Sequence, residues 1–144
     1  MRKVIRSWFS TFALIAVLAH ASEVKAQQVQ LIGEAKGSNE VPPLQSPASG
    51  RAVATYDPAT RTLSWTISYS GLASRPTAIH FHGPADSTRN AGIALLIAGS
   101  LDSPIKGSAV LTESQATDLL SSRWYLNIHT AAHPAGELRA QMTR

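Results

Sequence analysis

The fold is decided by the stretch Thr62-Leu63-Ser64-Trp65-Thr66-Ile67-Ser68-Tyr69-Ser70. Apolar and aromatic side chains alternate here with serine and threonine, and a period of two is typical of a strand with one buried face and one polar face. Upstream, Asp57-Pro58 suits the first two positions of a type I turn. Residues 51–56 therefore form the other arm of a predicted β-hairpin.

Further runs with strand character are separated by turn residues, and they lie at 29–34, 77–82, 92–98, 105–111, 124–130 and 137–142. One segment differs, because Thr112 and Gln115 have the spacing of a capping box and predict a short helix near 113–121. About eight strands, with turns about every 8–12 residues, predict an all-β fold, either an antiparallel β-sandwich or a small barrel.

Residues 1–26 have the pattern of a secretory signal peptide. Basic Arg2, Lys3 and Arg6 precede an uncharged apolar run at 8–19, and small residues near Ala26 suit a cleavage site. This run is shorter than the roughly 20 residues that span a bilayer. We therefore expect cleavage after Ala26 and a single secreted or periplasmic domain at 27–144 without a membrane span. An uncleaved anchor is the alternative.

The net charge of the whole chain is +4, which would favour a nucleic-acid partner. Residues 1–26 contain four of the 13 basic residues and one of the nine acidic residues, so their removal leaves a net charge of +1. The remaining basic residues are scattered and do not form the stripe that binds phosphates, so no nucleic acid is expected as a partner. The absence of cysteine excludes a disulfide scaffold and cysteine-based zinc or redox sites.

The histidines after the leader occur in two short segments. His80 and His82 are two residues apart on a predicted strand and therefore point to the same face. His129 ends another predicted strand, and His133 follows in the next turn. Imidazoles gathered from two strands can bind copper or zinc. Because the sequence does not show that the two strands are neighbours, histidines on the solvent-exposed face of a sheet remain the alternative.

Other residues offer less chemistry. The acidic residues are dispersed, so the sequence predicts no catalytic residue and no general acid–base pair. Glu137 and Arg139 are two apart on a predicted strand and are expected to form an ion pair on one face. Trp65 and Trp124 lie on apolar alternations and are expected in the core. Met142 is a candidate soft ligand for copper, although packing is the more common role of such a methionine.

A set of motifs occurs in a defined order along the chain: Glu40-Val41-Pro42-Pro43, Tyr56-Asp57-Pro58, Ser70-Gly71-Leu72, Ala78-Ile79-His80-Phe81-His82-Gly83-Pro84, and Trp124-Tyr125-Leu126-Asn127-Ile128-His129-Thr130 followed by Pro134, Gly136, Glu137, Arg139 and Gln141. Together they resemble the CHRD domain, the module named after chordin, which is also found as a single secreted domain in bacteria. The resemblance extends from about Val29 to Met142. It implies a β-sandwich of immunoglobulin-like or superoxide-dismutase-like character.

The resemblance also implies a shared copper site at His80, His82 and His129, and zinc is the alternative because imidazole ligands suit both ions. His133 stands where the family typically has asparagine, so it is either a fourth ligand or a neutral surface change. The first functional hypothesis is a secreted or periplasmic metal-binding protein. The second is a structural or protein-interaction module without a metal, whose partners are envelope or extracellular proteins. The third is a metal-dependent enzyme, placed last because no general acid or base is identifiable.

Overall fold

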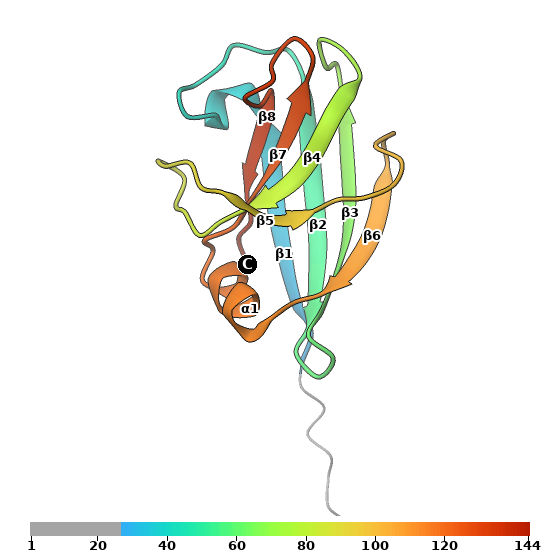
Figure 1. Cartoon of the computed structure of the whole chain (residues 1–144), viewed down its shortest axis with the longest axis vertical. Coiled ribbons are helices and arrows are strands. Elements are labelled where there is room, and N and C mark those ends of the chain that lie inside the picture. The colour runs from blue at the N-terminus through green and yellow to red at the C-terminus, as the bar shows by residue number, and fades with distance from the viewer. Residues whose placement is uncertain (1–26) are drawn as a thin grey trace, which may run out of the picture.

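The computed structural model describes residues 27–144, and the predicted leader at residues 1–26 lies outside the described residues. The secondary structure of this range comprises β1 (Val29–Lys36), η1 (Gly37–Asn39), β2 (Ser49–Asp57), β3 (Thr62–Ser70), β4 (Pro76–His82), β5 (Ile93–Leu96), β6 (Ile105–Val110), α1 (Glu113–Leu120), β7 (Tyr125–Thr130) and β8 (Leu138–Gln141) (Figure 1). The eight predicted strands and the predicted helix are all present, with ends within two residues of those expected. The 3-10 helix η1 was not predicted.

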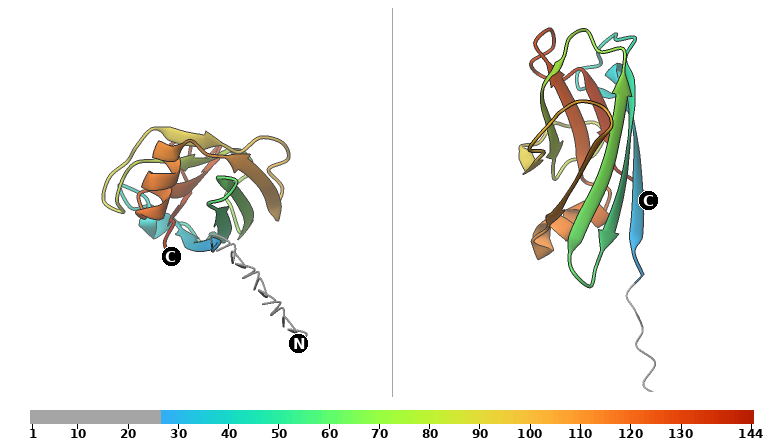
Figure 2. Two further views of the ribbon diagram at one scale, coloured as in Figure 1. Left: turned by 90° about the horizontal axis from the view of Figure 1, so that it is seen from below. Right: turned by 90° about the vertical axis from the view of Figure 1, so that its right-hand side faces the viewer.

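All eight strands belong to one antiparallel sheet with the order β5-β4-β7-β8-β1-β2-β3-β6. Figure 2 shows this sheet from below, where it curls into a half-barrel. The prediction of an antiparallel all-β fold is confirmed, but the sandwich has to be corrected. Strands β8 and β1 pair at Arg139 and Lys36, and Thr143 forms a further bridge with Ile32, so that hydrogen bonds join the two halves into one sheet.

The hydrophobic core fills the inside of this curl. Trp65 on β3 and Phe81 on β4 meet edge to face, with ring centroids 5.7 Å apart, although four strands separate β3 from β4 in the sheet order. The ring of Trp124 also packs against Phe81, with centroids 6.0 Å apart. Both tryptophans are buried as predicted. Met142 is fully buried against Gly33 of β1, which supports the packing role.

Local interactions explain where two of the elements begin and end. The Asp57 carboxylate accepts a hydrogen bond from the backbone N–H of Ala59 at 2.9 Å and so starts the turn between β2 and β3. At the start of α1, the Thr112 hydroxyl accepts from the N–H of Gln115, and the Gln115 side chain accepts from the N–H of Thr112. The predicted capping box is therefore confirmed.

Two long loops, at residues 40–48 and 83–92, lie over the outer face of β7 and β8 (Figure 1). Within residues 27–144, no helix has the length and apolar character that a membrane-spanning segment requires. The histidines lie on this sheet, next to the two loops.

Candidate metal centre

Strands β4 and β7 are direct neighbours in the sheet, which the sequence alone left open. Their antiparallel register places His80 opposite Asn127 and His82 opposite Tyr125, and His129 lies on the same face two positions further along β7. The intervening residues on both strands point into the core. The register therefore brings His80, His82 and His129 together on the outer face of the sheet.

The three imidazoles form a compact triangle. Their ring centroids are 5.2 Å apart for His80 and His129, 5.5 Å for His80 and His82, and 5.8 Å for His82 and His129. One ring nitrogen of each residue lies within 4.8 Å of the others, and all three side chains are half-buried. This spacing allows a modest closure of the rings to bring three nitrogens to one ion at the usual distance of about 2.0–2.1 Å.

Backbone carbonyls determine which nitrogen of two of these rings carries the proton. The Nδ1 atom of His82 lies 3.0 Å from the Ala91 carbonyl oxygen, and the Nδ1 atom of His129 lies 3.0 Å from that of Pro134. A carbonyl oxygen only accepts, so Nδ1–H is the donor in both contacts. In the neutral ring, Nε2 is then left with its lone pair free for a metal.

Three ring nitrogens of this triangle are buried without a hydrogen-bond partner in the described part of the chain: His80 Nδ1, His82 Nε2 and His129 Nε2. Buried polar atoms are normally paired, and each exception calls for an explanation. One ion bound by all three nitrogens would satisfy them together. Three neutral imidazoles are a suitable ligand set for copper or zinc, so the residues present fit such an ion.

The electrostatics of the site favour the form of histidine that binds metals. Burial lowers the pKa of His80 below 6.5, and the neighbouring His129 and His82 lower it further. Burial also lowers the pKa of His82, against the opposing effect of its hydrogen bond to Ala91. Both rings are therefore neutral at pH 7, and a metal does not have to displace protons from them.

The fourth candidate ligand, His133, lies outside this group of three. Its backbone N–H donates to the carbonyl and the hydroxyl oxygen of Thr130, which fixes the turn between β7 and β8. It lies near Glu137, where burial acts to raise the pKa of the carboxyl group but hydrogen bonds, chiefly from Thr130, lower it overall. The geometry thus gathers three of the four histidines that the sequence offered.

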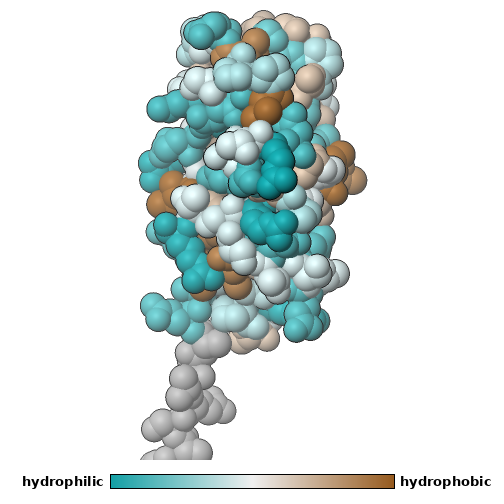
Figure 3. Space-filling model, turned by 90° about the vertical axis from the view of Figure 1, so that its left-hand side faces the viewer, coloured by the Kyte–Doolittle hydropathy of each residue, from teal (hydrophilic) through white to brown (hydrophobic). Residues whose placement is uncertain are grey.

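The face that carries the triangle is less exposed than the sequence indicated. Tyr125 and Asn127 alternate with His129 on this face, yet their side chains are only 2% and 3% exposed. The two long loops cover them, and the surface on the side of these loops is mostly hydrophilic, with small separate apolar patches (Figure 3). The expected solvent-exposed face is therefore a buried polar layer.

The predicted ion pair between Glu137 and Arg139 does not form. Glu137 precedes β8 and accepts hydrogen bonds from Thr130, Ala73 and Ser46 instead. Arg139 points under the loop at 83–92 and donates to residues of that loop. The prediction was wrong because Glu137 lies outside the regular strand, so the two side chains do not share a face.

Sequence reasoning also missed the polar residues around the triangle: Glu40, Tyr125, Asn127 and Arg139. A signal for two of them was present, because Tyr125 and Asn127 alternate with His129 in a period of two. Glu40 and Arg139 occur in the motifs that carry the family resemblance, but no periodicity linked them to the histidines, because their contacts join segments far apart in the chain.

One comparison with known proteins gives a match. The sequence model of the family described as CHRD domain matches residues 33–142, a range that contains β2 to β8 and all three histidines of the triangle. No curated protein and no solved structure matches the chain. The family match covers more than half of the sequence, and the chain therefore belongs to the CHRD domain family.

Proposed function

We propose that this protein is an exported CHRD-domain protein that binds one metal ion through His80, His82 and His129. The observation that carries the proposal is the set of three buried ring nitrogens on this face of the sheet that have no hydrogen-bond partner within residues 27–144. Copper is the first choice and zinc the second. Imidazole suits both ions, and the general order of affinities places Cu²⁺ above Zn²⁺ for a given nitrogen site.

The proposal is tested by titrating the purified mature protein with Cu²⁺ and with Zn²⁺ while melting curves are recorded. A bound ion stabilises only the folded form, so the melting temperature should rise with the concentration of the ion. Alanine in place of His80, His82 or His129 should abolish most of this rise. His133→Asn is the matched control, because it changes a histidine outside the triangle, and it should bind as the parent does.

Two results would contradict the proposal. The first is an unchanged melting temperature of the parent protein with either ion. The second is a His129→Ala variant that binds copper and zinc as tightly as the parent. A large loss of affinity in His133→Asn would instead show that the ligand set includes a fourth histidine.

A protein-interaction module outside the cell is the second candidate function, and two exposed apolar side chains favour it. Leu96 and Ile93 of the edge strand β5 are 64% and 53% exposed. The register of β5 places Leu96 opposite His80 and Ile93 opposite His82. Substitution of both by serine should leave metal binding unchanged but remove binding to an envelope or extracellular partner, if this second function holds.

Export itself rests on the leader pattern at residues 1–26. We propose cleavage after Ala26, which gives a mature chain that starts at Gln27. Mass spectrometry of the protein recovered from outside the cytoplasm should give the mass of residues 27–144. A mass that still includes Met1 would overturn the proposed cleavage.

A further inference from the structure

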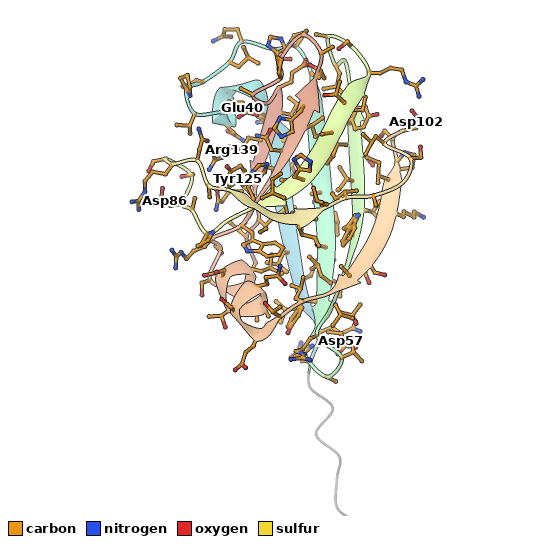
Figure 4. The ribbon with its side chains drawn as sticks, viewed as in Figure 1. Glu40, Asp57, Asp86, Asp102, Tyr125 and Arg139 are labelled. Carbon is orange, nitrogen blue, oxygen red and sulfur yellow. The ribbon has the colours of Figure 1, made fainter. Side chains whose placement is uncertain are left out.

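Arg139 is buried beneath the loop at 83–92, with 1% of its surface exposed. Its Nη1 donates to Asn90 Oδ1 at 2.8 Å, and its Nη2 donates to the carbonyl oxygens of Asp86 and Arg89 at 2.9 and 2.8 Å. Figure 4 shows Arg139 beside Tyr125, with Asp86 on the loop that passes outside them. One guanidinium group therefore fixes three residues of this loop.

The residue that follows Asn90 in the loop contacts the histidine triangle. The Ala91 carbonyl oxygen accepts from His82 Nδ1 at 3.0 Å and from the Tyr125 hydroxyl at 3.3 Å. The Ala91 N–H donates to the same hydroxyl at 3.0 Å. Arg139 thus holds the loop at Asn90, one residue before the carbonyl that orients His82.

Arg139 is also connected to His82 through the ring of Tyr125. The ring stacks on His82, with centroids 5.1 Å apart and planes within 9° of parallel. The Cζ atom of Arg139 lies 3.5 Å from the centroid of the same ring. His82 comes from β4 and Arg139 from β8, the two strands that flank β7, so the tyrosine ring is held between them.

We propose that Arg139 is a positioning residue for the metal centre. It fixes both the Ala91 carbonyl and the Tyr125 ring, and these two groups together hold His82 with its proton on Nδ1 and its Nε2 directed toward the other two histidines. This inference rests on the proposed function, because the oriented Nε2 is valuable only when an ion binds there. Mutation of a residue that orients a metal ligand in this way typically lowers the metal affinity by about 10–100-fold.

A purely structural role for Arg139 makes a different prediction. Loss of its hydrogen bonds would then lower the stability of the whole domain, but the remaining folded molecules would keep the His82 tautomer and the metal affinity. The tautomer of His82 in the metal-free protein is therefore the decisive readout, and it can be measured by ¹⁵N NMR of the histidine side chains.

The test compares Arg139→Lys with the parent. Lysine keeps the charge, but its compact ammonium group lacks the rigid, planar fork of donors with which the guanidinium covers the tyrosine ring and reaches the loop at the same time. We expect a mixture of Nδ1–H and Nε2–H tautomers at His82 and a copper affinity about 10–100-fold below that of the parent. Arg51→Lys is the matched control, because Arg51 forms an exposed pair with Glu34 on the neighbouring strands β1 and β2 and has no contact with the loop at 83–92 among those described, so it should change neither quantity.

Asn90→Ala provides a second variant if Arg139→Lys does not fold. Asn90 is exposed, and its loss removes one acceptor of Arg139 and the donor to the Val41 carbonyl at 2.7 Å. The same change of tautomer and affinity is expected, to a smaller extent. Copper binding by the parent together with unchanged tautomer and affinity in both variants would overturn the role of Arg139 alone. Failure of the parent to bind copper or zinc would overturn the proposed function instead, and the His82 tautomer would still report on the positioning by Arg139.

Discussion

The side-chain amide of Asn127 donates to both carboxylate oxygens of Glu40, at 2.9 and 3.1 Å, and so joins strand β7 to the loop that follows η1. Glu40 is only 7% exposed. Burial raises its pKa to about 7, although the hydrogen bond from Asn127 and the charge of Arg139 act in the opposite direction. Glu40 also lines a pocket of about 460 Å³ together with Arg139 and Gln141.

This pair predicts how the stability of the metal-free protein depends on pH. The unfolded chain releases the Glu40 proton near pH 4.5, whereas the folded chain releases it near pH 7. At Glu40 the folded state therefore keeps its proton through this interval, and the contribution of Glu40 to stability should fall as the pH rises from about 4.5 to 7. One pKa unit corresponds to about 1.4 kcal/mol, so we expect a fall of about 2 kcal/mol after screening by solvent at the pocket.

Glu40→Gln isolates this effect, because glutamine keeps an acceptor for Asn127 but does not titrate. Urea unfolding of the parent and the variant, with a chelator present, gives the difference in free energy of unfolding at each pH. Glu40→Gln should gain stability relative to the parent between about pH 4.5 and 7 and stay constant above that. A difference that does not vary with pH would contradict the raised pKa.

Gly136→Ala should destabilise the protein strongly. Gly136 has a φ of 132°, and an added Cβ would lie 2.3 Å from Asn127 Oδ1 and 2.8 Å from Glu40 Oε1. Backbone strain and the displaced pair should together cost at least about 3 kcal/mol in the free energy of unfolding. Gly99→Ala is the control for strain alone, because Gly99 has a φ of 95° with open space around it, and it should cost about 1 kcal/mol. If both variants lose the same free energy of unfolding, the contact of the added Cβ with Asn127 and Glu40 does not contribute to the destabilisation.

Gly107→Ala should disturb the core through Trp65. Gly107 on β6 lies opposite Trp65 on β3, and an added Cβ would come within 2.7 Å of the indole ring. We expect overpacking to lower the free energy of unfolding by about 1–3 kcal/mol. In a Trp65→Phe background the smaller ring leaves space, so the same substitution should cost less, and denaturant unfolding of the four proteins measures this coupling. If the losses in free energy of unfolding from the two single substitutions simply add in the double variant, the indole ring is not the cause of the destabilisation by Gly107→Ala.

Copper affinity should fall steeply in acid. Metal binding requires neutral imidazoles, and the pKa values of His80 and His82 lie below 6.5 because of burial. The affinity should therefore stay nearly constant above about pH 7 and fall below about pH 6, with release of more than one proton per ion in that lower range. Competition titrations between about pH 5 and 8 measure the effect. A constant affinity across this range would exclude binding by three histidines.

The sequence by itself determined the local structure. Alternation in Thr62–Ser70 predicted a strand and its buried face, and Thr112 with Gln115 predicted the start of the helix. Period-two geometry likewise required His80 and His82 to share a face. These features depend on residues only a few positions apart, whose conformations are restricted by the backbone itself, and this is why all eight strands could be located in advance.

Only the tertiary structure decided which strands are neighbours. The pairing of β4 with β7 brings His129 to His80 and His82, and the pairing of β8 with β1 turns two expected sheets into one curled sheet. The burial of Tyr125, Asn127 and Arg139 depends in the same way on loops that fold back from distant parts of the chain. Such contacts are selected by the packing of the whole core and by the need to pair buried polar groups, and no local pattern in the sequence encodes either of them.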